Sequence, residues 1–523
     1  MGIQRSFVGV VAVSWLLAWA GTTAGEVLEL PTARSLDGVG ALQVALDGAE
    51  ADVLIDASAP ASLRAEVLER AADGAPRTGR LVLAPQAAGP WRLVRPVGAE
   101  SVAVRVELVV PPHLALEIVG RDIALSAQSA VLPTADDASD GSSEPGTPRR
   151  RSRPAERGVQ SGSTDTDTRG GLRVEVEASS LDLLGLRGAR LETSESFVVC
   201  DRCAGATTLT ANGGTAELTA HRGALDVLAT DAAVSIRGLE GGLVVDLLGG
   251  SLDVLGGIGM ARLDARDASL RVDRRRGPLH AELEASSLTV ADLVNERTAD
   301  LDPAAPRDAG RESSLRLIAR DGSRLDLAGV QASILVQLDG ADLEAVELDG
   351  RLELEAQNDA SVQIADSSVQ LRASQHSGTM ELRSLRGAAR LAARDLSLRL
   401  DEVQQLSLDG SGLDLSGGSV GRITRLDLAA SVVDLDLSSL DPGHLGLRFG
   451  ASSDVDLRLP VPCVVQMRSD ETLESEQIDV TGCDLRMPEQ PLRSARSNLR
   501  YGRRPLTTVI TLDSGTEVRV RGQ

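Results

Sequence analysis

The stretch from Gly241 to Val254 reads GGLVVDLLGGSLDV, in which a short alternating run of apolar residues follows each small-residue turn. The pattern recurs about every nine residues, each time beginning at a glycine or another small residue. Because alternate residues of a strand point to the same face, each repeat predicts one short strand that buries two side chains. A fixed short period of this kind is typical of a stacked β-solenoid. The marker residues are Gly205, Gly214, Gly223, Ala232, Gly241, Gly250, Gly259, Ala268, Gly277 and Ser286.

Two positions in each repeat are predicted to face the interior. The first is occupied by Thr207, Ala216, Leu225, Val234, Leu243, Leu252, Ala261, Leu270, Leu279 and Leu288. The second lies two residues later and is occupied by Leu209, Leu218, Val227, Ile236, Val245, Val254, Leu263, Val272, Ala281 and Val290. Similar pairs continue from Leu315/Leu317 to Val455/Leu457, with uneven spacing after Ile364.

The number of strands in one coil depends on a weaker signal. Leu225-Asp226-Val227-Leu228 reappears three repeats later as Leu252-Asp253-Val254-Leu255, and Val245-Asp246 reappears as Val272-Asp273. This repetition favours coils of about 27 residues with three strands each. The predicted fold class is therefore all-β: a single-stranded parallel β-solenoid (β-helix), preceded by a small β region and closed by a C-terminal β cap.

Composition divides the chain into five regions. Residues 1–24 resemble a cleaved signal peptide, with an uncleaved anchor as the alternative, and no later apolar run is long enough to form a transmembrane segment. Residues 25–132 form an N-terminal β region and the start of the solenoid. Residues 133–170, which are rich in Ser, Asp, Gly and Pro and contain an Arg-rich run, form a disordered linker or loop. Residues 171–459 form the solenoid with an inserted loop at 291–313, and residues 460–523 form the cap, with a hairpin between 507–512 and 516–520.

The four cysteines fit a chain that folds in an oxidising compartment. Cys463 and Cys483 are predicted to form a disulfide that staples the C-terminal cap. Cys200 and Cys203 form a C-x-x-C motif next to the repeat. A structural disulfide is the preferred interpretation, because a redox motif needs a helix N-terminus and a zinc site needs a second matching pair. A redox or metal role is the alternative.

Charge and composition exclude several classes of function. The formal net charge is -22, which disfavours binding to nucleic acid phosphates. All 54 basic residues are arginine, so Schiff-base chemistry and a P-loop lysine are excluded. Aromatic residues make up 1% of the chain, fewer than a sugar-stacking platform needs. No cofactor is expected.

No catalytic or metal-binding residues are predicted. The histidines, His113, His221, His280, His376 and His444, are scattered and are interpreted as surface residues. With 27-residue coils, Asp226 would stack on Asp253 and Asp246 on Asp273, about 5 Å apart. We expect these carboxylates to be solvated or paired with arginine, with weak divalent cation binding as an alternative and acid/base catalysis as a further one.

Three features resemble a known group. Residues 104–118 read VRVELVVPPHLALEI, G-x-L-x-V repeats follow, and residues 509–518 read VITLDSGTEV. Together they resemble the bacterial putative-adhesin family with β-strand repeats, which is related to the head domain of auto-transporter adhesins. The resemblance covers most of the chain beyond the leader. It implies an envelope-associated, non-enzymatic β-solenoid and supplies no catalytic residues.

The sequence therefore predicts a non-enzymatic exported protein that acts as an envelope scaffold, adhesion or protein-interaction module. Its expected partner is a protein or another envelope component, in the periplasm or outside the cell. A polysaccharide-acting β-helix enzyme is one alternative, and it would need carboxylates and arginine that converge in a groove beside residues 291–313. A divalent-cation-binding solenoid is the other.

Overall fold

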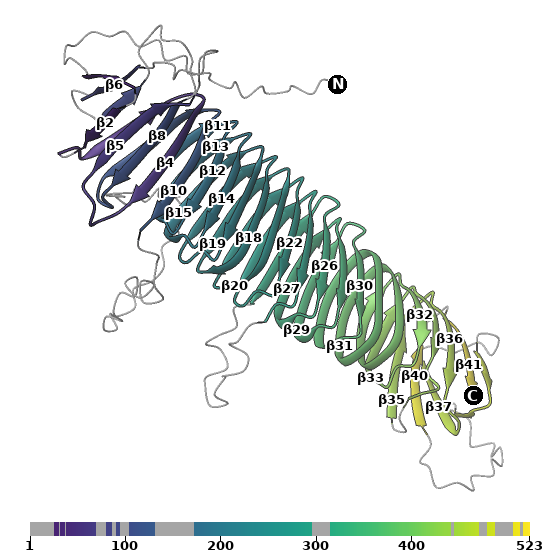
Figure 1. The fold of residues 1–523 in the computed structure, drawn as a ribbon. Coiled ribbons are helices and arrows are strands. Elements are labelled where there is room, and N and C mark those ends of the chain that lie inside the picture. The colour runs from purple at the N-terminus through teal and green to yellow at the C-terminus, as the bar shows by residue number, and fades with distance from the viewer. Residues whose placement is uncertain are drawn as a thin grey trace, which may run out of the picture.

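The computed structural model describes residues 26–30, 32–36, 38–68, 80–85, 90–94, 104–130, 172–294, 314–440, 444–469, 478–486, 506–512 and 516–522. Among these residues every helix or strand assigned is a β-strand, and the strands stack into an elongated rod (Figure 1). The fold is all-β and solenoid-like, as predicted. The predicted signal peptide, the linker at 133–170 and most of the loop at 291–313 lie outside the described residues.

One coil contains two strands and not three. Strand β17 (Leu225–Thr230) pairs in parallel with β15 (Ala204–Asn212) and with β19 (Leu243–Leu248), and Thr207 lies opposite Leu225, two repeats further along the chain. The strands between them, β16 (Thr215–Thr219) and β18 (Ala233–Glu240), form a second parallel ladder with the same offset. The predicted 27-residue, three-strand coil is wrong. Because the nine-residue unit has the same pattern on both sides of the coil, segments that match after three repeats belong to opposite ladders.

The two ladders form two faces of the rod. In spatial order, face 1 consists of β1 (Glu26–Glu29), β6 (Arg80–Ala84), β7 (Trp91–Val94), β3 (Ala41–Ala45), β9 (Ala115–Arg121), β11 (Leu172–Glu177), β13 (Arg187–Ser194), β15, β17, β19, β21 (Ala261–Arg266), β23 (Leu279–Glu284), β25 (Leu315–Arg320), β27 (Gln331–Asp339), β29 (Asp349–Gln357), β31 (Ser368–Ser411), β33 (Arg422–Ala429), β35 (His444–Phe449), β40 (Leu506–Leu512), β37 (Cys463–Ser469) and β39 (Asp484–Arg486).

Face 2 consists, in the same direction, of β2 (Thr32–Ser35), β5 (Ser62–Val67), β8 (Val104–Val110), β4 (Ala49–Ile55), β10 (Ala124–Ser129), β12 (Ser180–Leu184), β14 (Phe197–Asp201), β16, β18, β20 (Ser251–Ile258), β22 (Ser269–Asp273), β24 (Ser287–Ala291), β26 (Arg324–Ala328), β28 (Asp342–Val346), β30 (Ser361–Ala365), β31, β32 (Asp414–Gly418), β34 (Val432–Asp436), β36 (Asp454–Leu459), β41 (Glu517–Gly522) and β38 (Ile478–Thr481). Strand β31 appears in both faces because it runs around the rod without interruption and pairs with β29 and β33 on face 1 and with β30 and β32 on face 2.

The interior is a continuous aliphatic core. All of the predicted inward residues between Thr207 and Val290 are buried, and so are the pairs from Leu315/Leu317 to Val455/Leu457. A regular face 1 strand buries three residues instead of the predicted two, as Leu225, Val227 and Ala229 show. Each added coil buries mainly Leu, Val and Ala, at roughly 25 cal/mol per Å² of apolar surface.

After each face 1 strand the chain turns to face 2 through what we call the serine corner. A residue with positive φ, such as Asp231 (φ 51) or Asp267 (φ 54), precedes one small inward residue. Where that residue is serine, as at Ser286, its hydroxyl donates to the Glu284 carbonyl and accepts from the Ala268 amide of the previous coil. The small buried corner residues are Ser179, Ser196, Ala232, Ala268, Ser286, Ser323, Ala341, Ala360, Ser431, Ser453 and Thr516, and the larger Ile123, Leu396 and Leu413 occupy the same position in three other coils.

The opposite turn, from face 2 back to face 1, is the glycine corner. Its inward residues form a mainly apolar column that includes Leu239, Leu293, Leu348 and Leu385. In its most regular part, successive glycines lie directly over one another. A Cβ added to Gly241, which has a φ of 149°, would lie 2.1 Å from the Gly223 carbonyl oxygen. Only glycine allows the coils to approach this closely, since any side chain would separate the hydrogen-bonded backbones.

Both ends of the rod contain a coil inserted out of chain order. The first coil, β3 and β4, lies between β7/β8 and β9/β10. The last, β40 and β41, lies between β35/β36 and β37/β38. The predicted hairpin between 507–512 and 516–520 is wrong, because β40 and β41 pair in parallel with neighbours on different faces. Residues 513–515 between them lie outside the described residues. At the N-terminal end, antiparallel β5 and β6 interrupt the parallel order.

The glycine corner gives a test of the register. Gly241→Ala should destabilise the protein by about 2–4 kcal/mol, because the methyl group collides with the Gly223 carbonyl and the residue keeps a positive φ. The neighbouring Gly242→Ala is the matched control, since a Cβ there has no atom within 4 Å. Thermal unfolding followed by circular dichroism measures both. Equal melting temperatures for the two variants would contradict the stacked-glycine register.

Candidate functional site

The main surface feature is a shallow groove along face 1, which we call the face 1 groove. Its largest hollow has a volume of about 820 Å³ and extends from Ile318 on β25 to Ser411 at the end of β31. A second hollow of about 510 Å³ shares Ser374 and Ala392 with it. Two smaller hollows of about 390 and 170 Å³ continue the groove toward β19. The groove therefore crosses consecutive coils along the rod.

Side-chain size explains where the groove is deepest. Outward residues of face 1 form columns along the rod axis, because parallel strands in register place equivalent side chains about 4.8 Å apart. Along the middle of the largest hollow, Glu355 is followed by Ser374 and Ala392, which leave space above the sheet. Longer side chains, among them Arg372 and Arg394, stand on either side.

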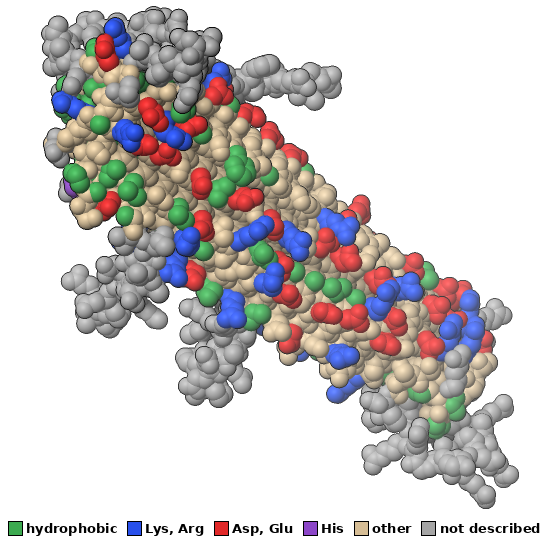
Figure 2. Space-filling model, in the orientation of Figure 1, with side chains coloured by type: hydrophobic (Ala, Val, Ile, Leu, Met, Phe, Trp, Pro, Cys, Tyr) green, Lys and Arg blue, Asp and Glu red, His purple; other side chains and the backbone are tan. Residues whose placement is uncertain are grey.

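Charges of both signs line the groove. Arg262 contacts Asp264 at 3.3 Å and Arg266 contacts Glu284 at 2.7 Å, both between face 1 side chains. The view in Figure 2 likewise shows arginine and acidic side chains intermixed along the rod. Part of the surface charge of the groove is therefore balanced locally.

Four arginines of the groove are exceptions to this balance. Arg316, Arg320, Arg372 and Arg390 form no ion pair within the described part of the chain, and all four are exposed. Their guanidinium groups are the uncommitted charges of the groove.

The predicted acidic stacks are wrong. With 18-residue coils, Asp226 lies opposite Val244, while Asp253 lies on the other face. Asp246 lies on face 1 and Asp273 on face 2, so the second predicted pair is separated as well. A different column stacks Asp246, Asp264 and Glu282 on face 1. Within the described ranges, no group of three or more His, Cys, Asp or Glu side chains is placed to hold a metal ion.

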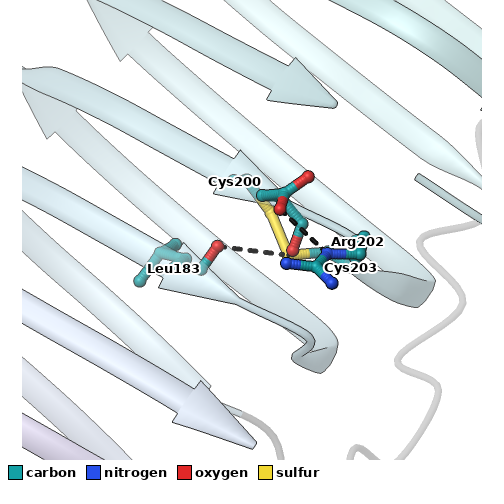
Figure 3. The surroundings of a disulfide bond; sticks show 5 residues. Leu183, Cys200, Arg202 and Cys203 are labelled. Carbon is teal, nitrogen blue, oxygen red and sulfur yellow. Dashed lines mark hydrogen bonds and ion pairs between the residues drawn. A yellow bond between two sulfur atoms is a disulfide. The ribbon is translucent and has the colours of Figure 1, made fainter. Parts of the chain in front are cut away.

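The four cysteines form the two predicted pairs. Cys463 is bonded to Cys483, and this bond connects the start of β37 to the turn between β38 and β39. Cys200 is bonded to Cys203 across the turn at the end of β14, with the Cα atoms 6.3 Å apart (Figure 3). Cys200 is inward-facing between Leu183 and Leu218, and both cysteines are buried. Two sulfur atoms in the core support the structural interpretation over redox exchange with an external partner.

The histidines are not all surface residues as predicted. His113 and His376 are exposed and His280 is half-buried, but His221 is only 1% exposed. The side chain of His444 lies outside the described set. His221 is an inward residue of the glycine corner, and burial lowers its pKa, an effect that nearby backbone groups partly offset. Sequence reasoning missed it because only the 18-residue register places this histidine in the apolar column.

A buried arginine in the same column was also not predicted. Arg275 is 0% exposed, and its Nη2 donates to the carbonyl oxygens of Gly259 (3.1 Å), Gly241 (3.4 Å) and Met260 (3.4 Å). Within the described part of the chain, its Nε and Nη1 have no hydrogen-bond partner. The equivalent position one coil earlier is Gly257, where an added Cβ would lie 2.4 Å from the Leu239 carbonyl oxygen. Desolvation lowers the pKa of Arg275 to about 10.

Comparison with known proteins adds no relative. No family model matches the chain, and no match is found among curated proteins or solved structures. The resemblance to the adhesin family therefore stays a prediction. The structure contains no helix long and apolar enough to cross a membrane among its described residues.

Replacing Arg275 tests how much its burial lowers the stability of the folded protein. Arg275→Leu should stabilise the protein by about 1–4 kcal/mol, because leucine fits the column that holds Leu239 and Leu293 and removes a buried charge without a counter-ion. Arg271→Leu on exposed face 2 is the control and should change stability by less than about 0.5 kcal/mol. Denaturant unfolding measures both. A destabilised Arg275→Leu would show that the three carbonyl contacts outweigh desolvation.

His221 should make stability depend on pH. Because its pKa is lower in the folded chain than the ordinary 6.5, the unfolded chain binds the proton more readily below that pH. The contribution of His221 to the free energy of unfolding is complete above about pH 6.5. It decreases as the pH falls, by at most about 1.4 kcal/mol per pH unit. His221→Leu should therefore lose less stability than the wild type between pH 7.5 and 5.0, measured by thermal unfolding. His376→Leu, at an exposed position, should keep the wild-type loss; identical losses in all three proteins would contradict this.

Proposed function

We propose that the protein is a non-enzymatic, exported binding rod that acts as an envelope scaffold, adhesion or protein-interaction module through the face 1 groove. The single observation that carries the proposal is the continuity of the groove over consecutive coils from β19 to β31. A shallow groove along a rod fits an extended ligand that makes many small contacts, whereas a compact small molecule is usually enclosed.

The rod is well suited to hold such a surface in a fixed shape. Every coil is hydrogen-bonded to the next through both faces, and the corners add further backbone hydrogen bonds, such as Gly241 N to Ile258 O at 2.8 Å. Because the groove floor consists of these paired strands, a ligand would meet preformed positions and lose little energy to ordering the protein.

Two disulfides and the predicted signal peptide support an exported location. Disulfides persist in the periplasm and outside the cell, where the compartment is oxidising. In both bonds at least one cysteine is buried, so the pairs belong to the folded rod. This support is independent of the groove.

A polysaccharide-acting enzyme is the second candidate, and one observation favours it. Asp264 and Glu282 lie in adjacent coils beside Arg316, in a hollow of about 170 Å³ next to the start of β25, where the inserted loop rejoins the solenoid. Carboxylates about 5 Å apart can act as an acid/base pair. Every parallel ladder gives that spacing, however, and Asp264 is already paired with Arg262 at 3.3 Å, so the arrangement favours a solvated ladder.

Blocking the groove tests the proposed function. Ala392 is an exposed floor residue of both large hollows, so Ala392→Trp should fill them without entering the core. Ser397→Trp is the matched control, because it is exposed on face 2 in the same strand. The immobilised proteins are incubated with envelope extract from the native cells, and bound components are measured by quantitative mass spectrometry. A component that binds the wild type should be retained by Ser397→Trp and reduced at least tenfold by Ala392→Trp.

Two results would contradict the proposal. One is equal retention of every component by both tryptophan variants. The other is release of new reducing ends from an envelope polysaccharide by the wild type, abolished in Asp264→Asn/Glu282→Gln, which would establish the enzyme instead.

A further inference from the structure

Two stacked arginines in the face 1 groove, Arg372 and Arg390, form no ion pair among the described residues. Arg390 follows Arg372 by one coil within β31, and the same offset places Gly387 directly over Val369, where a Cβ on the glycine would collide with the Val369 carbonyl oxygen. The two side chains therefore project side by side from adjacent coils, whose strands are about 4.8 Å apart. Like charges directly opposite each other on neighbouring strands repel.

Other arginines on face 1 are compensated by nearby carboxylates. Arg173 lies within 4 Å of Glu117, Glu175 and Glu192, and Arg425 contacts Asp409 at 2.8 Å and Asp427 at 3.0 Å. Such contacts connect arginines to carboxylates of the same strand and of adjacent coils. The Arg372/Arg390 stack is an exception to this arrangement.

The neighbours of the stack do not supply the missing charge. Glu353 lies opposite Arg372, but its carboxylate is paired with Arg351. On the other side, Ser407 lines the same hollow as Arg390 and is neutral. Glu355 also lines this hollow, opposite Ser374, but its carboxylate accepts a hydrogen bond from Gln337 at 3.0 Å and forms no ion pair with the stack among the described residues.

Beside the stack lies open space with hydrogen-bonding groups. The hollow of about 510 Å³ next to Arg372 and Arg390 has Ser374 and Ala392 as its small outward residues. Across them, in the adjoining hollow, stand His376 and Arg394. A ligand there would meet guanidinium donors, a hydroxyl and a small-residue floor, with the Glu355 carboxylate at one end and no deep apolar pocket for an anchoring side chain.

From this arrangement we propose that Arg372 and Arg390 bind the acidic groups of a linear anionic polysaccharide that lies along the face 1 groove. The inference rests on the proposed function and specifies its ligand. Guanidinium groups bind carboxylate or sulfate through paired hydrogen bonds, and serine and glutamine side chains of the groove can bind sugar hydroxyls. A peptide is less well matched, because bound peptides usually place apolar side chains in pockets.

The negative charge of the whole chain does not prevent this binding. Charges are screened over about 8 Å at physiological ionic strength, which is less than the height of two coils. The local charge at Arg372 and Arg390 therefore dominates at short range. Binding should persist at physiological ionic strength and weaken as salt rises further, since it depends on partly exposed charge pairs.

The test uses the full chain and defined oligosaccharides in isothermal titration calorimetry. An oligogalacturonate supplies carboxylates, a sulfated glucan oligomer supplies sulfates, and an uncharged glucan oligomer of equal length is the neutral control. The wild type should bind at least one anionic glycan, and Arg372→Gln/Arg390→Gln should weaken that binding at least tenfold. Arg237→Gln/Arg399→Gln removes the same charge from exposed face 2 positions and should retain affinity within twofold. Circular dichroism confirms that each variant is folded.

Several outcomes would overturn the inference. It fails if the wild type binds neither anionic glycan, if the neutral glucan binds equally well, or if the face 1 and face 2 variants lose affinity equally. It also fails if poly-glutamate binds more tightly than either glycan, which would assign the arginines to an acidic peptide. The proposed function is judged separately by Ala392→Trp. If that variant loses an envelope component while the arginine variant keeps every affinity, the rod is a binding module with a different ligand.

Discussion

Superposition of consecutive coils is the constraint on which the rest of this structure depends. Backbone hydrogen bonds between coils require each corner to repeat the geometry of the previous one. Positive φ values before the inward corner residue contribute to this at both corners, as at Asp231 in the serine corner and Asp292 in the glycine corner. Close contact between Gly241 and the Gly223 carbonyl adds to it in the glycine corner. These local requirements cost conformational energy, which the many parallel hydrogen bonds and the buried aliphatic core offset.

The same constraint creates columns of side chains along each face, and these columns determine the surface chemistry. A residue at an outward position meets its equivalent in the next coil, so charge must be balanced coil by coil. Arg425 is balanced by Asp409 of the previous coil and by Asp427 of its own strand. Arg372 and Arg390 form no ion pair within the described part of the chain, and they lie where small side chains open the groove. The candidate site thus follows from the spacing of the coils as well as from the residues.

Column geometry also explains why two titratable residues lie in the core. His221 and Arg275 both occupy the inward column of the glycine corner, where most coils have leucine or valine. Arg275 is accommodated because its guanidinium reaches carbonyl oxygens at the corners of earlier coils. A regular repeat can therefore tolerate an irregular residue where neighbouring coils present unused hydrogen-bond acceptors.

The sequence by itself determined the all-β solenoid, its inward residues and the two cysteine pairs, because alternation and small-residue turns are local properties. It could not determine whether a coil has two or three strands, since strands such as β17 and β20 carry the same pattern although they lie on opposite faces. The out-of-order insertion of β40 and β41, the burial of His221 and the groove beside Arg372 all depend on which strands become neighbours. Neighbour choice is a property of long-range pairing, and only the tertiary structure decided it.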